Sequence, residues 1–323
     1  MMGLLQRCLG SLLARGSHGR RLLILTYHRV LDAPDPMLDG GVDTAGFDWQ
    51  LRVLAANFNV LRLDEAMARL AAASLPPRAV ALTFDDGYAD NYLNALPILR
   101  RHGLSASFFI ATAFLNGGRM WNDTLIESLR RAAGPRLSLP AIGLDALDIS
   151  TPQARLATCA RVIGHLKHRP LHERQEAVEQ VANSIGQPLP DDLMMTDAQV
   201  RGLRDAGMHI GAHTASHPVL AAVDAATARR EIAEGRDYLR GLLQDPVDVF
   251  AYPNGRPGHD YSRQHVDLVK QLGFKSAMST AWGYADAKSD LWQTPRIAPW
   301  DKVPWRFGVR LLRAYREPQA AAV

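Results

Sequence analysis

Two adjacent aspartates end a short apolar segment of the sequence. The segment 80–84 (VALTF) runs directly into Asp85 and Asp86, and Gly87 follows. In barrels built from alternating strands and helices, catalytic side chains lie at the C-terminal ends of the strands. Because side chains alternate along an extended chain, the two carboxylates cannot point the same way. One can therefore bind a metal ion while the other moves protons. The alternative is a solvated Asp-Asp-Gly turn without a chemical role.

Two histidines follow a second short apolar segment. His213 and His217 stand four residues apart in the sequence 211–218 (GAHTASHP), directly after the segment 209–212. Residues spaced in this way share one face of a helical turn. Two imidazoles and a carboxylate from another strand end can bind a divalent ion and leave positions open for water. Asp86 can provide that carboxylate. The histidine pair alone is weak evidence, whereas its combination with the aspartate pair is specific.

Short apolar segments alternate with helical patterns along the chain, which is typical of repeated βα units and a parallel sheet. The predicted strands are 22–27, 80–84, 106–111, 209–212, 249–252 and 276–278. The predicted helices are 47–56, 64–72, 92–101, 197–206, 225–243 and 265–272. Six such units predict an α/β barrel rather than a flat sheet. The stretch from Asn122 to about Leu193 is mostly helical and too long for a βα connection, so it is predicted to be a helical insertion.

The composition is that of an ordinary globular protein. The chain has 323 residues, of which 47% are hydrophobic and 22% charged. These fractions exclude collagen-like, coiled-coil and wholly disordered chains. Cys8 and Cys159 lie far apart and form no CxxC pair, so neither a disulfide framework nor a cysteine-based metal site is encoded.

Basic residues are concentrated at the two ends of the chain. Residues 1–30 contain five arginines and no acid, and an apolar stripe near the C-terminus lies beside basic residues (Trp305, Val309 and Leu312 beside Arg306, Arg310 and Arg313). We predict a basic amphipathic segment over 1–20, a catalytic barrel over 21–300, and a basic helix and tail over 301–323. Each end could contact an anionic membrane surface or pack its apolar stripe on the barrel. No apolar run approaches the roughly 20 residues of a membrane span, and the first residues fit a signal peptide poorly. We therefore expect a cytoplasmic protein that could lie at the inner face of the membrane.

The chain resembles the polysaccharide deacetylases, the NodB-homology family also called carbohydrate esterase family 4. Residues 83–87 (TFDDG) resemble the first family motif and residues 213–217 (HTASH) the second, while residues 250–255 (FAYPNG) occupy the place of the third. The resemblance extends from about Leu22 to Trp300. It implies a distorted (β/α)7 barrel and metal-dependent hydrolysis of N-acetyl groups on amino sugars.

The resemblance also assigns roles to individual residues. Asp85 is the expected base, and Asp86, His213 and His217 are the expected metal ligands. Tyr252 is expected to offer its backbone N–H to the oxyanion. The ion is expected to be a single divalent metal, with Zn²⁺ as the default, although Fe, Co and Ni suit the same ligands.

Two departures from the family pattern affect the expected site. The third motif usually carries an arginine that holds the catalytic aspartate, but here Phe250 and Ala251 precede the Tyr-Pro pair. Arg296 could replace that arginine. Many members place a general-acid histidine near the C-terminus, but the last histidine in this chain is His265. His28 also ends an apolar strand and is the best candidate for the acid, as in the exopolysaccharide branch of the family, whose members deacetylate poly-N-acetylglucosamine. Alternatively, His28 is a structural histidine bonded to backbone.

Five further residues are weaker candidates for a sugar cleft: Trp121, Asn122, Asp123, Trp282 and Trp300. Each could equally serve packing.

The expected partner is an N-acetylated poly- or oligosaccharide. Two other functions remain open: a metal amidohydrolase of the same fold that acts on a small non-sugar amide or cyclic imide, and a non-catalytic sugar-binding barrel. Nucleic-acid binding is not expected, since the basic residues cluster at the termini with no recognised nucleic-acid module beside them.

Overall fold

The computed structural model describes residues 21–38, 41–317 and 322–323. The basic amphipathic segment predicted over 1–20 therefore lies outside the described residues. Within the described part of the chain, no helix is both long enough and apolar enough to cross a membrane.

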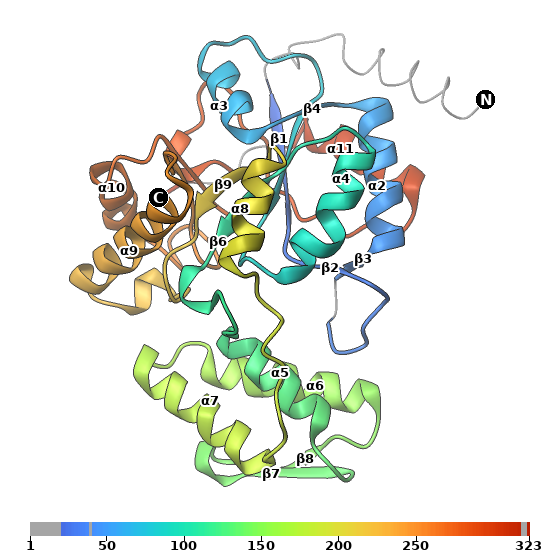
Figure 1. Cartoon of the computed structure of the whole chain (residues 1–323), viewed down its shortest axis with the longest axis vertical. Coiled ribbons are helices and arrows are strands. Elements are labelled where there is room, and N and C mark those ends of the chain that lie inside the picture. The colour runs from blue at the N-terminus through green and yellow to red at the C-terminus, as the bar shows by residue number, and fades with distance from the viewer. Residues whose placement is uncertain (1–20, 39–40, 318–321) are drawn as a thin grey trace.

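A curled parallel sheet forms the centre of the larger lobe (Figure 1). Its strands lie in the order β1-β5-β6-β9-β10-β11, and a further short strand, β4, pairs with β5. Their bounds are β1 Leu22–Tyr27, β4 Asn59–Leu61, β5 Ala79–Phe84, β6 Ser107–Ile110, β9 His209–Ala212, β10 Val249–Ala251 and β11 Ser276–Met278. All six predicted strands are present, each within one residue of its predicted ends. β4 was not predicted, because its three residues are half-buried or exposed and form no apolar run.

A segment without strand structure closes the curled sheet into a distorted barrel. Thr294 bridges to Met278 of β11, and Ile297 bridges to Leu25 of β1. The Thr294 N–H donates to the Ala277 carbonyl at 2.9 Å, and the Thr26 N–H donates to the Ile297 carbonyl at 3.0 Å. The segment 294–297 therefore takes the place of a strand between the first and last strands of the sheet. The fold is the predicted α/β distorted barrel.

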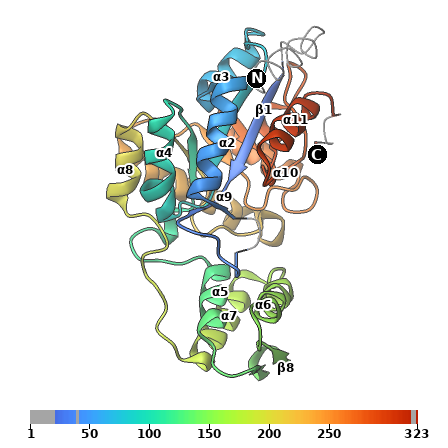
Figure 2. The same ribbon diagram turned by 90° about the vertical axis from the view of Figure 1, so that its right-hand side faces the viewer.

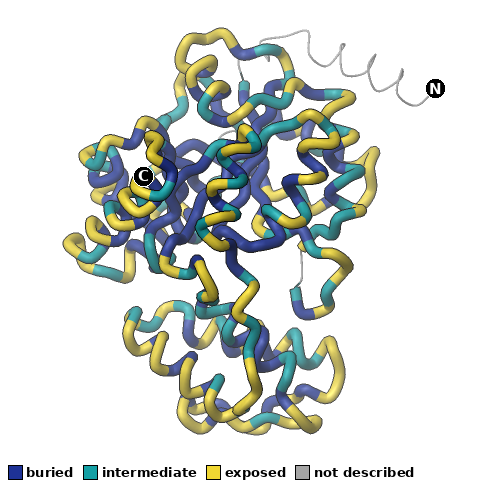
Figure 3. The backbone as a smooth tube through the Cα atoms, viewed as in Figure 1, coloured by how far each residue is buried: buried dark blue, intermediate teal, exposed yellow. Residues whose placement is uncertain are grey.

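Helices cover the outside of the sheet (Figures 1 and 2). They are α2 Thr44–Asn57, α3 Leu63–Ala71, α4 Leu96–Arg101, α8 Asp197–Asp205, α9 Ala225–Leu243, α10 Arg263–Gln271 and α11 Pro304–Ala314. Shorter elements connect them: β2 Val30–Leu31, β3 Val42–Asp43, and the helical turns η1 Asn91–Ala95, η2 Thr112–Phe114, η4 Leu220–Ala222 and η5 Leu291–Gln293. Buried residues concentrate in the central strands, and exposed residues lie on the outer faces of the helices (Figure 3). This pattern is the one that amphipathic helices on a buried parallel sheet require.

The insertion forms a separate lobe below the barrel in Figures 1 and 2. It contains α5 Trp121–Arg131, β7 Arg136–Leu139, η3 Pro140–Ile142, β8 Leu144–Asp148, α6 Pro152–Leu166 and α7 Leu171–Ile185. Its helices and hairpin share an apolar core of their own. The sequence predicted a mostly helical insertion but not the antiparallel pair β7 and β8, because these strands are short and the turn between them contains Pro140 and Gly143. Gly143 adopts a φ of 70°, which suits the turn between them.

Helix α11 packs on the barrel through a different face from the predicted one. Phe307, Leu311 and Ala314 are buried against α2, and the Phe307 ring meets Trp49 edge-on at 5.6 Å. Trp305, which the sequence placed in the packing stripe, is 55% exposed. The predicted stripe was therefore wrong, because Phe307 rather than Trp305 is the first aromatic residue to reach α2.

Candidate active site

Asp86, His213 and His217 form a compact cluster where β5 and β9 end. One ligand atom of each residue lies within 4.8 Å of the others. Nε2 of His213 is 3.5 Å, and Nε2 of His217 is 3.4 Å, from Oδ1 of Asp86. This buried Oδ1 has no hydrogen-bond partner in the described structure. Two imidazole nitrogens around an unpartnered carboxylate oxygen are a donor set that suits a divalent ion.

The two imidazoles face Asp86 in an orientation that suits metal ligation. Nδ1 of His213 donates to the Ala251 carbonyl at 2.7 Å, which fixes the ring with its Nε2 toward Oδ1 of Asp86. Burial lowers the pKa of His217 to about 4, which leaves this imidazole neutral at neutral pH. Burial alone would raise the pKa of Asp86, but the neighbouring His213 and His217 hold it below its usual range.

The backbone around the cluster is strained. Asp86, Thr214 and His217 have positive φ angles of 77°, 65° and 54°. Such angles are uncommon outside glycine, and a β-branched residue such as Thr214 rarely adopts one. Strain of this kind persists only where surrounding contacts hold it, and it often marks functional sites.

Helix α9 holds the strained loop in place. The buried carboxylate of Glu231 accepts hydrogen bonds from the Ser216 N–H at 2.8 Å, the Ser216 hydroxyl at 2.7 Å and the Ala215 N–H at 3.2 Å. One turn further along, a Cβ on Gly235 would lie 2.5 Å from the Thr214 carbonyl oxygen. Neither residue was predicted from the sequence to belong to the site. The available signal was an acidic side chain on the otherwise apolar face of a helix that carries Ala228, Ile232 and Leu239.

Asp85 points away from this cluster toward Arg296. Two guanidinium nitrogens of Arg296 donate to Oδ1 and Oδ2 of Asp85, both at 2.7 Å. The two side chains are 0% and 3% exposed. Burial alone would raise the pKa of Asp85, but the charge of Arg296 outweighs it and holds that pKa below its usual range. Arg296 lies in the closing segment 294–297, so an arginine does face this aspartate although the third motif lacks one.

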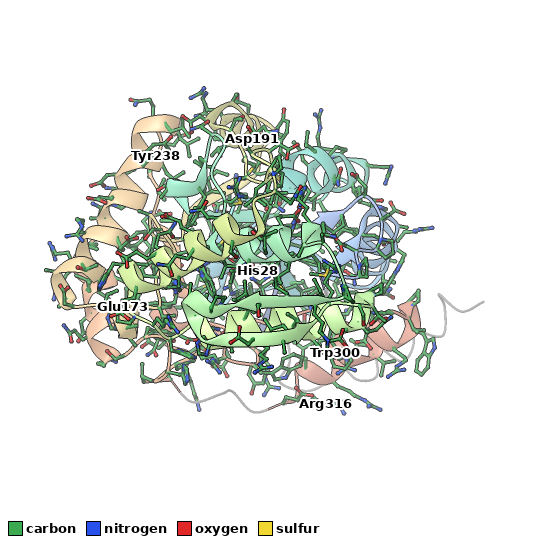
Figure 4. The ribbon with its side chains drawn as sticks, turned by 90° about the horizontal axis from the view of Figure 1, so that it is seen from below. His28, Glu173, Asp191, Tyr238, Trp300 and Arg316 are labelled. Atoms are coloured by element: carbon green, nitrogen blue, oxygen red, sulfur yellow. The ribbon has the colours of Figure 1, made fainter. Side chains whose placement is uncertain are left out.

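His28 follows β1 directly, and Figure 4 shows it near the centre of the view from below. Its side chain is exposed and lines both cavities around the cluster. Its backbone carbonyl accepts a hydrogen bond from Asn91 Nδ2 at 2.8 Å, whereas the ring bonds to no residue that the structure describes.

The expected role of Tyr252 is wrong. Its N–H donates to the Met278 carbonyl at 3.1 Å, because Tyr252 continues the pairing of β10 with β11. Its hydroxyl donates to the Trp292 carbonyl at 3.0 Å, and its ring stacks on Tyr261 at 3.8 Å. The residue of this loop that lines the cavity is Asn254, which has a φ of 58°.

A cleft runs between the barrel mouth and the insertion. It comprises two cavities of about 310 Å³ and about 290 Å³ that share His28, Asp86 and Asn122. The first extends past Tyr88, Asp123 and Trp300, and the second past Trp121, Lys167 and Arg174. Four of the five weaker sugar-cleft candidates therefore line it.

The fifth candidate, Trp282, lines neither cavity. It packs against the barrel core, and its indole N–H donates to Glu317. Its role is therefore packing.

Comparisons with known proteins agree with this geometry. Residues 72–133 and 167–277 match the sequence profile of the polysaccharide deacetylase family. The YxkH protein of Bacillus subtilis (strain 168), a relative assigned to the polysaccharide deacetylases, is 20% identical over 86% of this chain and 71% of its own length.

Solved structures share the fold. The deacetylase PplD of Streptococcus pyogenes, in complex with acetate, has a TM-score of 0.61 and 21% identity over 92% of this chain and 99% of its own. IcaB of Ammonifex degensii has a TM-score of 0.59 and 19% identity over 92% of this chain and 98% of its own. The profile match covers more than half of the residues, and the chain belongs to the polysaccharide deacetylase family.

Proposed function

We propose that this polysaccharide deacetylase is a metal-dependent hydrolase that removes N-acetyl groups from the amino sugars of a poly- or oligosaccharide. The observation that carries the proposal is the position of Asp85. An arginine-held carboxylate lines the same cavity as three side chains that can bind a metal ion, an arrangement suited to hydrolysis of an unactivated amide.

The residues that would hold the ion are Asp86, His213 and His217. They fit a divalent metal because a buried carboxylate oxygen without a partner faces two Nε2 atoms. A bound ion would lower the pKa of its water and polarise the acetamide carbonyl. Zn²⁺ suits the ligands, as do Fe, Co and Ni.

Asp85 would take the proton from the attacking water. A general base must be ionised at the working pH, and the paired guanidinium of Arg296 favours the ionised form. The oxyanion that forms on the carbonyl needs a donor aimed at it. Asn254 lines the same cavity as Asp85 and is the residue we assign to this task in place of Tyr252.

His28 would protonate the departing amine. An amine leaves poorly unless it is protonated, and a positioned imidazolium can donate that proton. His28 is exposed in the cleft and lines the cavity that contains both Asp85 and the ligand cluster. The products would be acetate and a glucosamine-type unit.

The shape of the cleft favours a sugar chain over a small amide. Cavities extend from the ligand cluster in two directions, toward Trp300 and toward Trp121. Aromatic side chains in such positions can stack on sugar rings on both sides of the reacting unit. An N-acetylglucosamine polymer, as in the exopolysaccharide branch, fits this arrangement.

An acetate-release screen tests the proposal. The metal-loaded protein is incubated with N-acetylglucosamine oligomers, chitin, peptidoglycan and lipid-linked intermediates, and with small amides and cyclic imides as the competing class. Acetate from at least one sugar substrate is the expected result, and a chelator should abolish it. Turnover of the small amides alone would show that the substrate is not a polysaccharide.

A further inference from the structure

The cleft contains a third carboxyl group that the mechanism above does not use. Asp123 lies in the first turn of α5, the first helix of the insertion, and is 2% exposed. The Tyr88 hydroxyl donates to its Oδ1 at 3.2 Å. Its Oδ2 is buried and has no hydrogen-bond partner among the residues that the structure describes. Native proteins seldom bury such an oxygen without a donor.

The charged groups around Asp123 do not neutralise it. The Arg29 guanidinium lies over the Tyr88 ring, 4.6 Å from its centre, but its Nε donates to Asp90 at 2.7 Å. Glu127, one turn along α5, pairs with Arg130 and Arg131. Burial, together with the negative charges of Asp86 and Glu127, raises the pKa of Asp123 to about 7 against the opposing effects of Arg29 and the Tyr88 hydrogen bond.

Asp123 faces the cleft, where a substrate would bind, and is not part of the apolar core of the insertion. Asp123 lines the same cavity as His28, Asp86 and Trp300. A sugar whose acetamido group reaches the ligand cluster, and whose neighbour reaches Trp300, must pass this residue. Sugar hydroxyl groups are the hydrogen-bond donors that such a substrate presents in every ring.

We propose that Asp123 positions the substrate, its Oδ2 accepting a hydrogen bond from a hydroxyl group of the amino sugar bound in the cleft. This inference rests on the proposed function and deepens it. The insertion then provides specificity for a sugar, while the barrel provides the chemistry. Asp123 is a positioning residue, because it acts on the placement of the ring and not on the reacting bond.

The Asp123→Asn variant separates placement of the sugar ring from the reaction at the amide bond. Its amide oxygen can keep the hydrogen bond from Tyr88, which places the NH₂ group where Oδ2 stood and replaces an acceptor with a donor. Glu127→Gln is the matched control, since it removes a charge from the same helix at a residue that lines neither cavity. Thermal unfolding and bound metal should be measured for both variants, and Asp123→Ala serves as a second substitution.

The assay compares an N-acetylglucosamine oligomer with 4-nitrophenyl acetate, which has no hydroxyl group. For the oligomer, Asp123→Asn should raise KM by roughly 10- to 100-fold, the effect of one hydrogen bond to a charged group, with little change in kcat. Hydrolysis of 4-nitrophenyl acetate and the metal content should stay as in the unmodified protein, and Glu127→Gln should behave normally on both substrates.

Three outcomes would overturn the inference. An unchanged KM means that no substrate hydroxyl group bonds to Oδ2. A fall in kcat at constant KM means that Asp123 acts in proton transfer. An equal loss on both substrates means a structural role. If the unmodified protein hydrolyses the aryl ester but releases no acetate from any sugar, the proposed function itself fails, and that result is distinct from the other three.

Discussion

Arg296 binds both carboxylate oxygens of Asp85, although 211 residues separate them in the chain. Arg296 also donates through Nε to the Ser279 carbonyl at 3.0 Å, so its guanidinium plane is fixed from two sides. The pair links β5 to the segment that closes the barrel, because Arg296 belongs to the segment that lies between β11 and β1. Folding of that segment and orientation of the proposed base are therefore linked.

Arg296→Lys should lower both activity and stability. Lysine keeps the charge but cannot bind both oxygens in a plane, so the pKa of Asp85 should rise and the acidic limb of the pH–rate profile should move to higher pH. Arg296→Ala leaves a buried carboxylate without a partner and should cost about 3–5 kcal/mol in free energy of unfolding. Denaturant unfolding at several pH values measures this.

The sign of that pH dependence follows from the pKa of Asp85, which is lowered in the folded state. The pair contributes stability above the unfolded pKa near 4, and this contribution disappears as the pH falls through the folded value. The free energies of unfolding of the unmodified protein and of Arg296→Ala should therefore differ most at neutral pH and become similar in acid. A difference that grows in acid would contradict the assignment.

Gly235→Ala should disturb the ligand loop without unfolding the barrel. The added Cβ would clash with the backbone of Thr214, which should displace His213 and His217 and weaken metal binding by about 10- to 100-fold, as seen when outer-shell partners are lost. Gly241→Ala is the control on the same helix, because a Cβ there meets nothing within 4 Å. It should leave metal binding unchanged and stabilise the helix by up to about 1 kcal/mol. Equal metal affinity in the two variants would show that α9 does not hold the loop.

Asp123→Asn should stabilise the protein toward alkaline pH. The pKa of Asp123 is raised to about 7 in the folded state, whereas an unfolded aspartate titrates near 4. Between these values the folded state binds more protons than the unfolded state, so this group makes stability fall as the pH rises. Asparagine does not titrate, so the variant lacks this loss of stability. The melting temperature of the variant relative to the unmodified protein should therefore increase from pH 4 to pH 8, and a flat difference would contradict the raised pKa.

His28→Ala should separate the two kinds of leaving group. Removal of a general acid typically reduces turnover by roughly 10²- to 10⁴-fold, so release of acetate from the N-acetyl sugar should almost stop while fold and metal content persist. An aryl acetate needs little protonation of its leaving group and should react at nearly the normal rate. Equal slowing of both substrates would make His28 a structural residue.

The sheet was predictable because its strands are continuous apolar runs. Every residue of β1 and β5 is buried, and strands buried on both faces are nearly continuous apolar runs. The short strand β4 and the hairpin of the insertion lack that signal. The packed face of α11 was mispredicted because several registers of an amphipathic helix contain aromatic residues, and only the contact with α2 selects Phe307.

The site was predictable only as far as motifs mark strand ends. Strands β5 and β9, which flank β6, bring Asp86 and His213 together because the C-terminal ends of parallel strands share one edge of the sheet. Contacts between segments that are distant in the chain have no sequence motif that predicts them. Glu231 contacts the ligand loop from helix α9. Asn254 replaces Tyr252 as the candidate because the Tyr252 N–H is already bonded to Met278 within the sheet.

Metal titration of the metal-free protein tests the central claim most directly. Acetate release from an N-acetylglucosamine oligomer should rise with added divalent ion and saturate at one equivalent per chain, as elemental analysis should also find. Asp85→Asn should bind the same equivalent and release almost no acetate, whereas Asp86→Ala and His213→Ala should lose metal and activity together. Full activity in the metal-free protein, or stoichiometric metal in a folded variant that lacks both Asp86 and His213, would contradict the account.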